Sequence, residues 1–406
     1  MLLHSHKLSG LKTKKSILDS SSKTFFYWGF FHLNTEMSYD SEVLFEENFP
    51  ALDSGTLEYL KDLSSRRKAL EESINGTSFT SEVIQREMSG GLTSQCQRDL
   101  QKLELYLPLL ENLILQLDKI ENKNRVFRWT SELRLRWSSA INASSMLNLG
   151  TPKFFQINDL RFELGMVLFL YGALLRERAL EIIMSQDLAE SCTLFRKAAG
   201  VYNYLAEDVL PVLQPLLPRE RPIEVMTSMS NVMKLICLAE AQAVTTNRAE
   251  QRASSQNLLT KLQYGVTQFL LEARYIMKSD VDLYNVSNRL VDFISLNCLL
   301  HQARGQKHVA IELYEEGKIG LAIGVLRDAV SNMSGRSPSN ESWHAVFSEE
   351  KSALRVILKR YEDENGFIYL ERIPDAYELP SLEGKRIVEA IPYAPKRLGR
   401  ELMFRI

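Results

Sequence analysis

The sequence predicts an all-α protein, a single curved solenoid of antiparallel helices that ends in an extended strip. Two observations predict this fold. From about residue 54 onward, apolar residues recur with the helical period and short loops separate the helices, with hardly any strand alternation. Residues 364–395 then contain Pro374, Pro380, Pro392 and Pro395, which lack amide donors and push the preceding residue out of the helical region.

Composition places the chain among ordinary soluble proteins. Of its 406 residues 45% are apolar and 25% charged, and the formal net charge is −2. Because no basic run is long enough to follow a phosphate backbone, we expect no nucleic-acid ligand. The four cysteines show no CxxC spacing and are predicted to be reduced thiols in a cytosolic protein. They are Cys96, Cys192, Cys237 and Cys298.

The first 36 residues differ from the rest and are predicted to form a flexible basic arm. They carry five lysines against Asp19 and Glu36, and their apolar run 24–33 is well short of the roughly 20 residues that span a bilayer. Since Met37 begins a segment that reads like a normal start, we expect the arm to be dispensable for the fold. An interfacial anchor is the alternative. The predicted division is an arm at 1–36, a helical domain at 37–396 and a short tail at 397–406.

The helices can be placed in order from their apolar stripes. One stripe runs from Leu57 to Ile74 and the next from Leu100 to Leu117, with a Gly- and Ser-rich loop between them. Residues 162–175 hold one charge in fourteen, which predicts a core helix buried on most of its circumference. Later helices are predicted at 187–205, 225–246, 256–277, 281–315, 319–333 and 349–364.

Two further segments have an alternative interpretation. Residues 125–137, RVFRWTSELRLRW, interleave aromatic and basic residues as nucleic-acid sites do. We prefer an amphipathic helix with Phe127, Leu133 and Trp137 on its apolar face and solvated arginines. In the C-terminal strip, Phe367 and its neighbours Ile368 and Tyr369 are predicted to be buried, since burying each is worth roughly 1.5–3 kcal/mol. A disordered Pro-rich tail is the alternative there.

The strip, ENGFIYLERIPDAYELPSLEGKRIVEAIPYAP, resembles the closing segment of the Bro-one domain family, the Alix-like endosomal scaffolds, and is most similar to single-domain members of the plant type. The matching positions are Asn365, Phe367, Ile368, Tyr369, Pro374, Asp375, Leu379, Pro380, Gly384, Val388 and Pro392. Residues 162–181, 195–210 and 235–242 (LICLAEAQ) are similar to three helices of the same family, in the same order. The resemblance implies a boomerang-shaped, tetratricopeptide-like solenoid with a small strand element near its N-terminus.

The resemblance also implies a function. Bro-one domains are non-catalytic adaptors that dock the C-terminal amphipathic helix of a Snf-type (charged multivesicular body protein) subunit of ESCRT-III in a groove, in endosomal sorting and multivesicular body traffic. The family register places the two aliphatic groove positions at Leu258 and Leu262, within NLLTKL. The aromatic groove position falls on Thr245, a departure that removes on the order of 1–2 kcal/mol of apolar contact. On their helical spacing alone, both leucines would be core residues.

Acidic residues beside the groove pair with basic residues of the ligand helix in this family, and Asp187 and Glu190 occupy the corresponding loop. As an Asp-x-x-Glu pattern they also read as a helix cap that needs no partner. A further alternative for the whole chain is a tetratricopeptide-like scaffold for an unrelated peptide. The residues from Ala310 to Ala322 resemble one turn of that repeat.

Chemistry-bearing motifs are missing from the sequence. His301 and His308 lie seven apart without a carboxylate at metal-ligand spacing, and no HExxH, Walker or GxSxG motif occurs. We therefore expect no enzyme activity, no metal, no cofactor and no small-molecule substrate. The expected partner is an ESCRT-III C-terminal helix, and the expected place is the cytoplasm, with recruitment to endosomes and peripheral association with their membrane.

Overall fold

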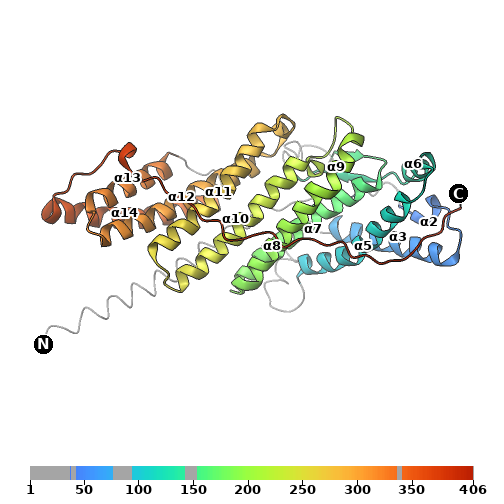
Figure 1. The fold of residues 1–406 in the computed structure, drawn as a ribbon, viewed down its shortest axis with the longest axis horizontal. Helices are drawn as coiled ribbons and strands as arrows, with labels where there is room; N and C mark the ends of the chain where they lie inside the picture. The colour runs from blue at the N-terminus through green and yellow to red at the C-terminus, as the bar shows by residue number, and fades with distance from the viewer. Residues whose placement is uncertain (1–36, 38–42, 76–93, 142–152, 336–340, 406) are drawn as a thin grey trace.

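The computed structural model describes residues 37, 43–75, 94–141, 153–335 and 341–405. The predicted arm at 1–36 lies outside this part of the chain. Within it, successive helices lie side by side and run back and forth, so that the molecule is an elongated helical stack (Figure 1). This confirms the predicted all-α solenoid.

The first half of the described chain holds three helices of more than 20 residues, several shorter ones and a small sheet. Its elements are α2 (Phe45–Asn48), α3 (Ser54–Asn75), α5 (Gln95–Asp118), α6 (Lys123–Ser131), β1 (Arg136–Ser138), β2 (Phe154–Gln156), α7 (Leu160–Met184), α8 (Leu188–Tyr204) and α9 (Leu210–Leu213). The second half holds α10 (Thr227–Gln251), α11 (Gln256–Ser279), α12 (Asn288–Glu315), α13 (Ile319–Ser334) and α14 (Glu341–Glu364). A π-helical turn, Asn365–Tyr369, follows α14.

Polar N-caps start most of the long helices. Each cap side chain accepts a hydrogen bond from a backbone N–H of the first turn, which would otherwise lack a partner. The caps are Ser94 for α5, Asp159 for α7, Asp187 for α8, Ser255 for α11 and Ser287 for α12. Helix starts are therefore encoded locally, as the capping pattern at Asp187 predicts.

The core is centred on α7, which is buried on most of its circumference as its composition predicts. The core also holds buried charged side chains, and that of Glu163 on α7 is one of them. The Glu163 carboxylate is fully buried and accepts hydrogen bonds from Arg67 of α3 (2.9 Å), Tyr106 of α5 (3.2 Å) and Trp137 of β1 (2.6 Å). Because a buried charge is tolerated only when it is paired and hydrogen-bonded, these bonds fix the relative positions of four elements.

A two-stranded antiparallel sheet follows α6, and it corrects one prediction. The helix predicted over 125–137 ends at Ser131, and Trp137 lies in β1 opposite Phe155. Arg134, just after the helix end, has a φ of 50°, and from Leu133 to Trp137 burial alternates with period two, with Leu133, Leu135 and Trp137 buried. The small strand element implied by the family resemblance is present.

The extended strip, residues 370–405, runs back along the solenoid from α13 toward α5 and α3 (Figure 1). Its backbone donates hydrogen bonds to carbonyls of the helices that it crosses: Lys385 N to Lys261 O of α11 (2.8 Å) and Ile391 N to Arg196 O of α8 (2.9 Å). Contacts continue beyond Pro395, because Phe404 is buried against the N-terminal helices. The strip therefore joins helices that are distant in sequence.

The apolar side chains of the turn that precedes the strip do not pack as predicted. Phe367 is 89% exposed, Ile368 67% and Tyr369 45%, so the prediction that they are buried is wrong. They lie on the π-helical turn, which the buried Asn365 closes. Its side-chain amide donates to the carbonyl of Glu371, and its side-chain oxygen accepts from the N–H of Glu371. Since this turn points outward, the strip is held by later residues, led by the buried Val388, Leu402 and Phe404.

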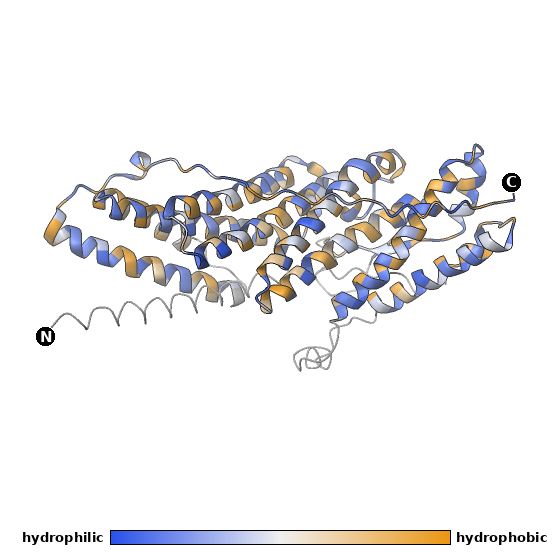
Figure 2. Ribbon diagram, turned by 60° about the horizontal axis from the view of Figure 1, so that its bottom comes forward, coloured by the Kyte–Doolittle hydropathy of each residue, from blue (hydrophilic) through white to orange (hydrophobic). Residues whose placement is uncertain are grey.

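Polar and apolar residues alternate around the helices (Figure 2), as expected for helices with one buried face. Among the helices of the described ranges, none is long and apolar enough to cross a membrane.

Candidate partner-helix groove

The predicted site residues come from three helices whose ends meet at one edge of the solenoid. The turn before α8 and the turn between α10 and α11 lie next to each other along the lower edge of Figure 1. Cys192 in the first turns of α8 contacts Ala241 and Thr245 near the end of α10, so these two helices are antiparallel. We call this region, formed by the start of α8, the end of α10 and the start of α11, the α8–α10–α11 corner.

The two aliphatic positions differ in exposure. Leu258 lies in the first turn of α11, directly after the Ser255 cap, and is 39% exposed. Leu262, one turn later, is 2% exposed. Leu258 can therefore meet a partner directly, whereas Leu262 is a core residue.

Thr245 is half-buried on the side of α10 that faces α8. Its hydroxyl donates to the carbonyl of Ala241 in its own helix (2.9 Å) and lies 3.5 Å from the Cys192 sulfur. These contacts direct the side chain toward α8, and no hydrogen bond in the described part of the chain joins it to α11. The corner thus brings Thr245 near the start of α8, with Leu258 on the neighbouring helix.

Sequence reasoning missed a residue that ties the corner to the strip. The side-chain amide of Gln242, the last residue of LICLAEAQ, donates to the carbonyls of Leu262 and Lys385, both at 2.9 Å. Its side-chain oxygen accepts from the N–H of Ile387 (3.0 Å). A glutamine that continues the apolar stripe of 235–242 was the available signal, because a buried amide must find partners, and Gln242 is fully buried. Gln242 therefore holds α10, α11 and the strip together at the corner.

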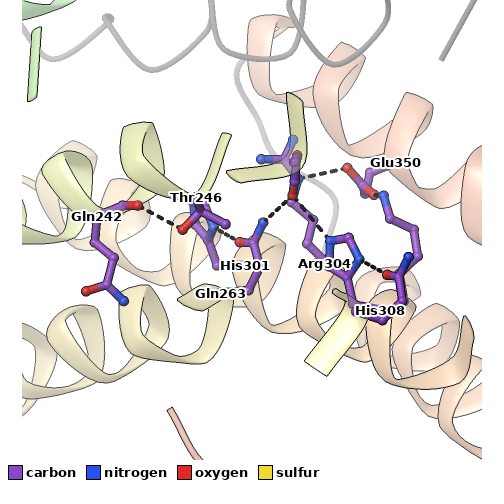
Figure 3. Close-up of polar contacts among 10 residues, drawn as sticks. Gln242, Thr246, Gln263, His301, Arg304, His308 and Glu350 are labelled. Carbon is purple, nitrogen blue, oxygen red and sulfur yellow. Dashed lines mark hydrogen bonds and ion pairs between the residues drawn. The ribbon is translucent and has the colours of Figure 1, made fainter. Parts of the chain in front are cut away.

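A polar network behind the corner fixes the start of α11 (Figure 3). Gln263 of α11 donates to Glu250 of α10 (3.0 Å) and lies 2.6 Å from the His301 ring nitrogen of α12. The His308 ring lies 2.7 Å from the side-chain oxygen of Gln256, the first residue of α11, and 3.2 Å from Glu250. The helix that carries Leu258 is therefore held on its inner side by two neighbouring helices.

The protonation states in this network follow from burial and charge. Burial, with Arg304 nearby, lowers the pKa of His301 well below its usual value, so the ring is neutral. Burial alone would raise the pKa of Glu250, but the hydrogen bond and charge of His308 outweigh it and lower the pKa. At Glu350, burial is likewise outweighed by Lys307 and Arg304, which lower its pKa. The Glu350 carboxylate is buried between Arg304 and Lys307, and the half-buried Glu250 contacts His308, as in structural ion pairs.

Asp187 and Glu190 lie at the rim of the corner. Both are exposed, and the Asp187 carboxylate accepts a hydrogen bond from the Glu190 N–H (3.0 Å), which makes it the N-cap of α8. The capping role is thus confirmed, and it leaves the outward carboxylate oxygens in solvent. The two residues place negative charge at the start of α8.

In the ranges that the structure describes, no group of His, Cys, Asp or Glu side chains is arranged to hold a metal ion. The corner presents one exposed leucine, a half-buried threonine, two exposed acidic residues at the start of α8 and a polar network behind α11.

The comparison with known proteins matches both the sequence and the fold. The family model described as BRO1-like domain matches residues 82–405. The human BRO1 domain-containing protein BROX is 25% identical over 310 residues, which cover 71% of each chain. The Caenorhabditis elegans Apoptosis-linked gene 2-interacting protein X 1 is 22% identical over 351 residues, which cover 84% of this chain and 38% of that protein.

Solved structures show the same arrangement. The structure described as the ALIX BRO1 CHMP4C complex superposes with a TM-score of 0.66 over 89% of this chain and 94% of that chain, at 18% identity. A Bro1 domain described in terms of endosomal targeting superposes with a TM-score of 0.61, also at 18% identity, over 89% of this chain and 92% of that one. With a family model that spans most of the sequence and this shared fold, the chain belongs to the BRO1-like domain family.

Proposed function

We propose that this chain is a non-catalytic adaptor whose α8–α10–α11 corner docks the C-terminal amphipathic helix of an ESCRT-III subunit in endosomal sorting. The observation that carries the proposal is the position of Leu258. It is an exposed leucine in the first turn of a long helix, at the register that the family uses for its aliphatic groove position, in a fold shared with a BRO1 domain that binds CHMP4C.

The surface suits a helix better than an extended peptide. An amphipathic helix lays apolar side chains spaced three and four apart into a groove, and the corner offers Leu258 with the turn of α11 behind it. A strand-like ligand would need free backbone donors and acceptors, but the backbone of Lys261, just beyond Leu258, already binds the strip. Basic residues of the incoming helix can face Asp187 and Glu190 at the rim.

Binding should be measured by titrating the full chain into a labelled peptide of the CHMP4C C-terminal helix. Leu258→Asp places a charge against the apolar face of the ligand, so we expect at least tenfold weaker binding with a normal circular dichroism spectrum. Leu271→Asp is the matched control, since Leu271 is 40% exposed on another face of the same helix. Its affinity should equal that of the unmodified chain.

Equal affinity of Leu258→Asp and Leu271→Asp for the peptide would show that the helix does not dock at the corner. Absence of binding by the unmodified chain would instead favour a different peptide ligand on the same solenoid. For the setting of this activity, we propose a cytoplasmic protein that is recruited to endosomes, as the description of one structural relative in terms of endosomal targeting supports.

A further inference from the structure

The side-chain amide of Gln242 connects three segments of the chain. Its nitrogen donates to the carbonyls of Leu262 on α11 and Lys385 on the strip, both at 2.9 Å, and its oxygen accepts from the N–H of Ile387 (3.0 Å). Because one end of the amide faces two carbonyl oxygens and the other end faces an N–H, a single orientation of the amide satisfies all three bonds. Gln242 is fully buried, so these partners fix its position.

Two glycines allow this connection to form. A Cβ on Gly265 of α11 would lie 1.9 Å from the Gln242 side-chain nitrogen and 2.4 Å from the carbonyl oxygen of Lys385. A Cβ on Gly384 of the strip would lie 2.7 Å from the side chain of Gln268 on α11. The strip and α11 therefore approach each other at backbone level. We call Gln242, Gly265 and the strip residues 384–388 the Gln242 junction.

The strip also holds the outer side of α11 next to this junction. The N–H of Lys385 donates to the carbonyl of Lys261 (2.8 Å). The Arg386 guanidinium pairs with Glu272 (2.7 Å) and lies 4.4 Å from the centre of the Phe269 ring. The strip therefore contacts α11 along about three helical turns, and the position of α11 depends on how the strip lies.

The junction is close to both helices that carry the predicted groove positions. On α10, Gln242 precedes Thr245 by three residues, and on α11 its acceptor Leu262 follows Leu258 by four. Since an α-helix has 3.6 residues per turn, the bond from Gln242 to Leu262 ties α10 to α11 about one turn from each groove position. The relative placement of the two helices at the corner is therefore set at Gln242.

We propose that Gln242 is a positioning residue for partner docking: the Gln242 junction holds α10 and α11 in the arrangement that the partner helix needs, so that seating of the strip on α11 and docking at the corner favour each other. This inference rests on the proposed function. Gln242 is buried and acts through the helices, without touching the partner. Two contacts that prefer the same arrangement of a protein strengthen each other by the same factor.

A purely structural role of Gln242 predicts a different result. Removal of an amide that only stabilises the fold lowers the free energy of unfolding and leaves the affinity of the folded molecules unchanged. Asn112 of α5 offers the comparison, because its buried amide donates to the carbonyl of Arg400 on the strip (3.0 Å). That contact lies toward the C-terminal end of the strip, away from the α10–α11 turn (Figure 1).

The test is titration of the full chain and its variants into the labelled CHMP4C helix peptide, with near-ultraviolet circular dichroism to show that each variant is folded. Gln242→Met keeps a side chain of similar size and removes all three hydrogen bonds. We expect its binding to be weaker by about fivefold or more, as is typical of coupled sites. Asn112→Leu is the matched control, and it should bind the peptide with the affinity of the unmodified chain.

Gly384→Ala is a second variant, which decides the matter if Gln242→Met does not fold. Its new Cβ pushes the strip away from α11 and leaves the side chains of Gln242 and Leu258 unchanged, so we expect weaker peptide binding here as well.

Hydrogen exchange measures the same coupling in the opposite direction. Saturating peptide should slow amide exchange in residues 384–388, which include the N–H groups of Lys385 and Ile387, and leave it unchanged at Arg405, whose N–H is bonded to Pro50. In Gln242→Met the slowing should be lost.

Equal peptide affinity of Gln242→Met, Gly384→Ala and the unmodified chain would show that Gln242 serves the fold alone. An equal loss of affinity in Asn112→Leu would assign the effect to general destabilisation, and it would also overturn the proposal. If the unmodified chain does not bind the peptide, the proposed helix docking fails and the positioning role fails with it. Normal binding by the unmodified chain and by Gln242→Met overturns the positioning role and leaves the docking in place.

Discussion

Leucines 258 and 262 are one helical turn apart, and their different burial gives opposite expectations for the same substitution. Leu258→Asp leaves the new carboxylate in solvent, whereas Leu262→Asp places it in the core without a partner. We expect Leu262→Asp to lower the free energy of unfolding by about 3–5 kcal/mol, measured by urea denaturation. Unfolding of Leu262→Asp at the same urea concentration as Leu258→Asp would contradict the placement of these side chains.

Thr245 stands where the proposed family register places an aromatic groove residue. Restoring an aromatic side chain, Thr245→Phe, should strengthen binding of the CHMP4C helix by up to about tenfold if the ring reaches the ligand. Thr245→Val is the control, because it removes the hydroxyl bond to Ala241 without adding a ring. If Thr245→Phe and Thr245→Val bind the peptide with equal affinity in the titration, that result counts against a groove shared with the family.

One carboxylate under the strip gives a pH prediction. Burial raises the pKa of Glu111 to about 7 from an ordinary 4.5, although the hydrogen bond donated by Tyr393 of the strip (3.0 Å) opposes the shift. Since the folded state holds this proton more tightly than the unfolded state, the free energy of unfolding falls as pH rises from about 4.5 to about 7. The loss at Glu111 is at most about 3 kcal/mol.

Glu111→Gln keeps an acceptor for Tyr393 and removes the titration. Urea unfolding at pH 5 and pH 8 should show the variant gaining stability relative to the unmodified chain as pH rises. A stability difference that is the same at both pH values would mean that Glu111 does not titrate in this range.

At the scale of elements, helix glycines allow the strip to lie against the solenoid. A Cβ on Gly200 of α8 would lie 1.7 Å from the carbonyl oxygen of Ile391, and one on Gly265 of α11 would lie 2.4 Å from that of Lys385. Both oxygens belong to backbone that hydrogen-bonds nearby, so neither can move away cheaply. Glycine is required here for close approach, with no need for an unusual φ.

We therefore expect Gly200→Ala and Gly265→Ala each to lower the free energy of unfolding by about 1–3 kcal/mol through displacement of the strip. Gly366→Ala is the control, since no atom lies within 4 Å of its Cβ position, and this change should be neutral or slightly stabilising. Thermal unfolding decides the matter. Destabilisation by Gly366→Ala equal to that of the other two variants would indicate a general effect of alanine.

Much of the arrangement of helices and strip could be predicted from the sequence, because helix periodicity, caps and prolines act locally. The start of α8 at Asp187 and the extended strip follow from such signals. The exposure of Phe367 could not be predicted, since it depends on the turn that Asn365 closes through bonds to Glu371. The partners of Gln242 were equally hidden, because they come from α11 and from the strip, 143 residues away.

At the scale of the whole molecule, the strip makes a string of neighbouring helix pairs into one unit. Its residues contact α13, α11, α10, α8 and α5 in turn, with Gly320 against Arg372 at one end and Asn112 bound to Arg400 at the other. A solenoid whose repeats contact only their neighbours unfolds in segments, whereas a strip along its length couples them.

Truncation after Leu370 should therefore abolish cooperative unfolding and leave a helical but molten or insoluble product. Near-ultraviolet circular dichroism and calorimetry test this. A soluble truncated chain that melts in one sharp transition near the temperature of the full chain would show that the strip is an accessory. For residues 1–36 we expect the opposite result. A chain that begins at Met37 should melt at the same temperature as the full chain and bind the CHMP4C helix peptide with the same affinity.

The central claim is that an ESCRT-III helix docks at the α8–α10–α11 corner. Amide hydrogen exchange of the full chain, followed by mass spectrometry with and without the CHMP4C helix peptide, tests it most directly because it maps the contact without a substitution. The account predicts slower exchange at the start of α11, around Leu258, and at the start of α8, around Asp187, with no change in α14. Protection confined to other helices, or none at saturating peptide, would contradict it.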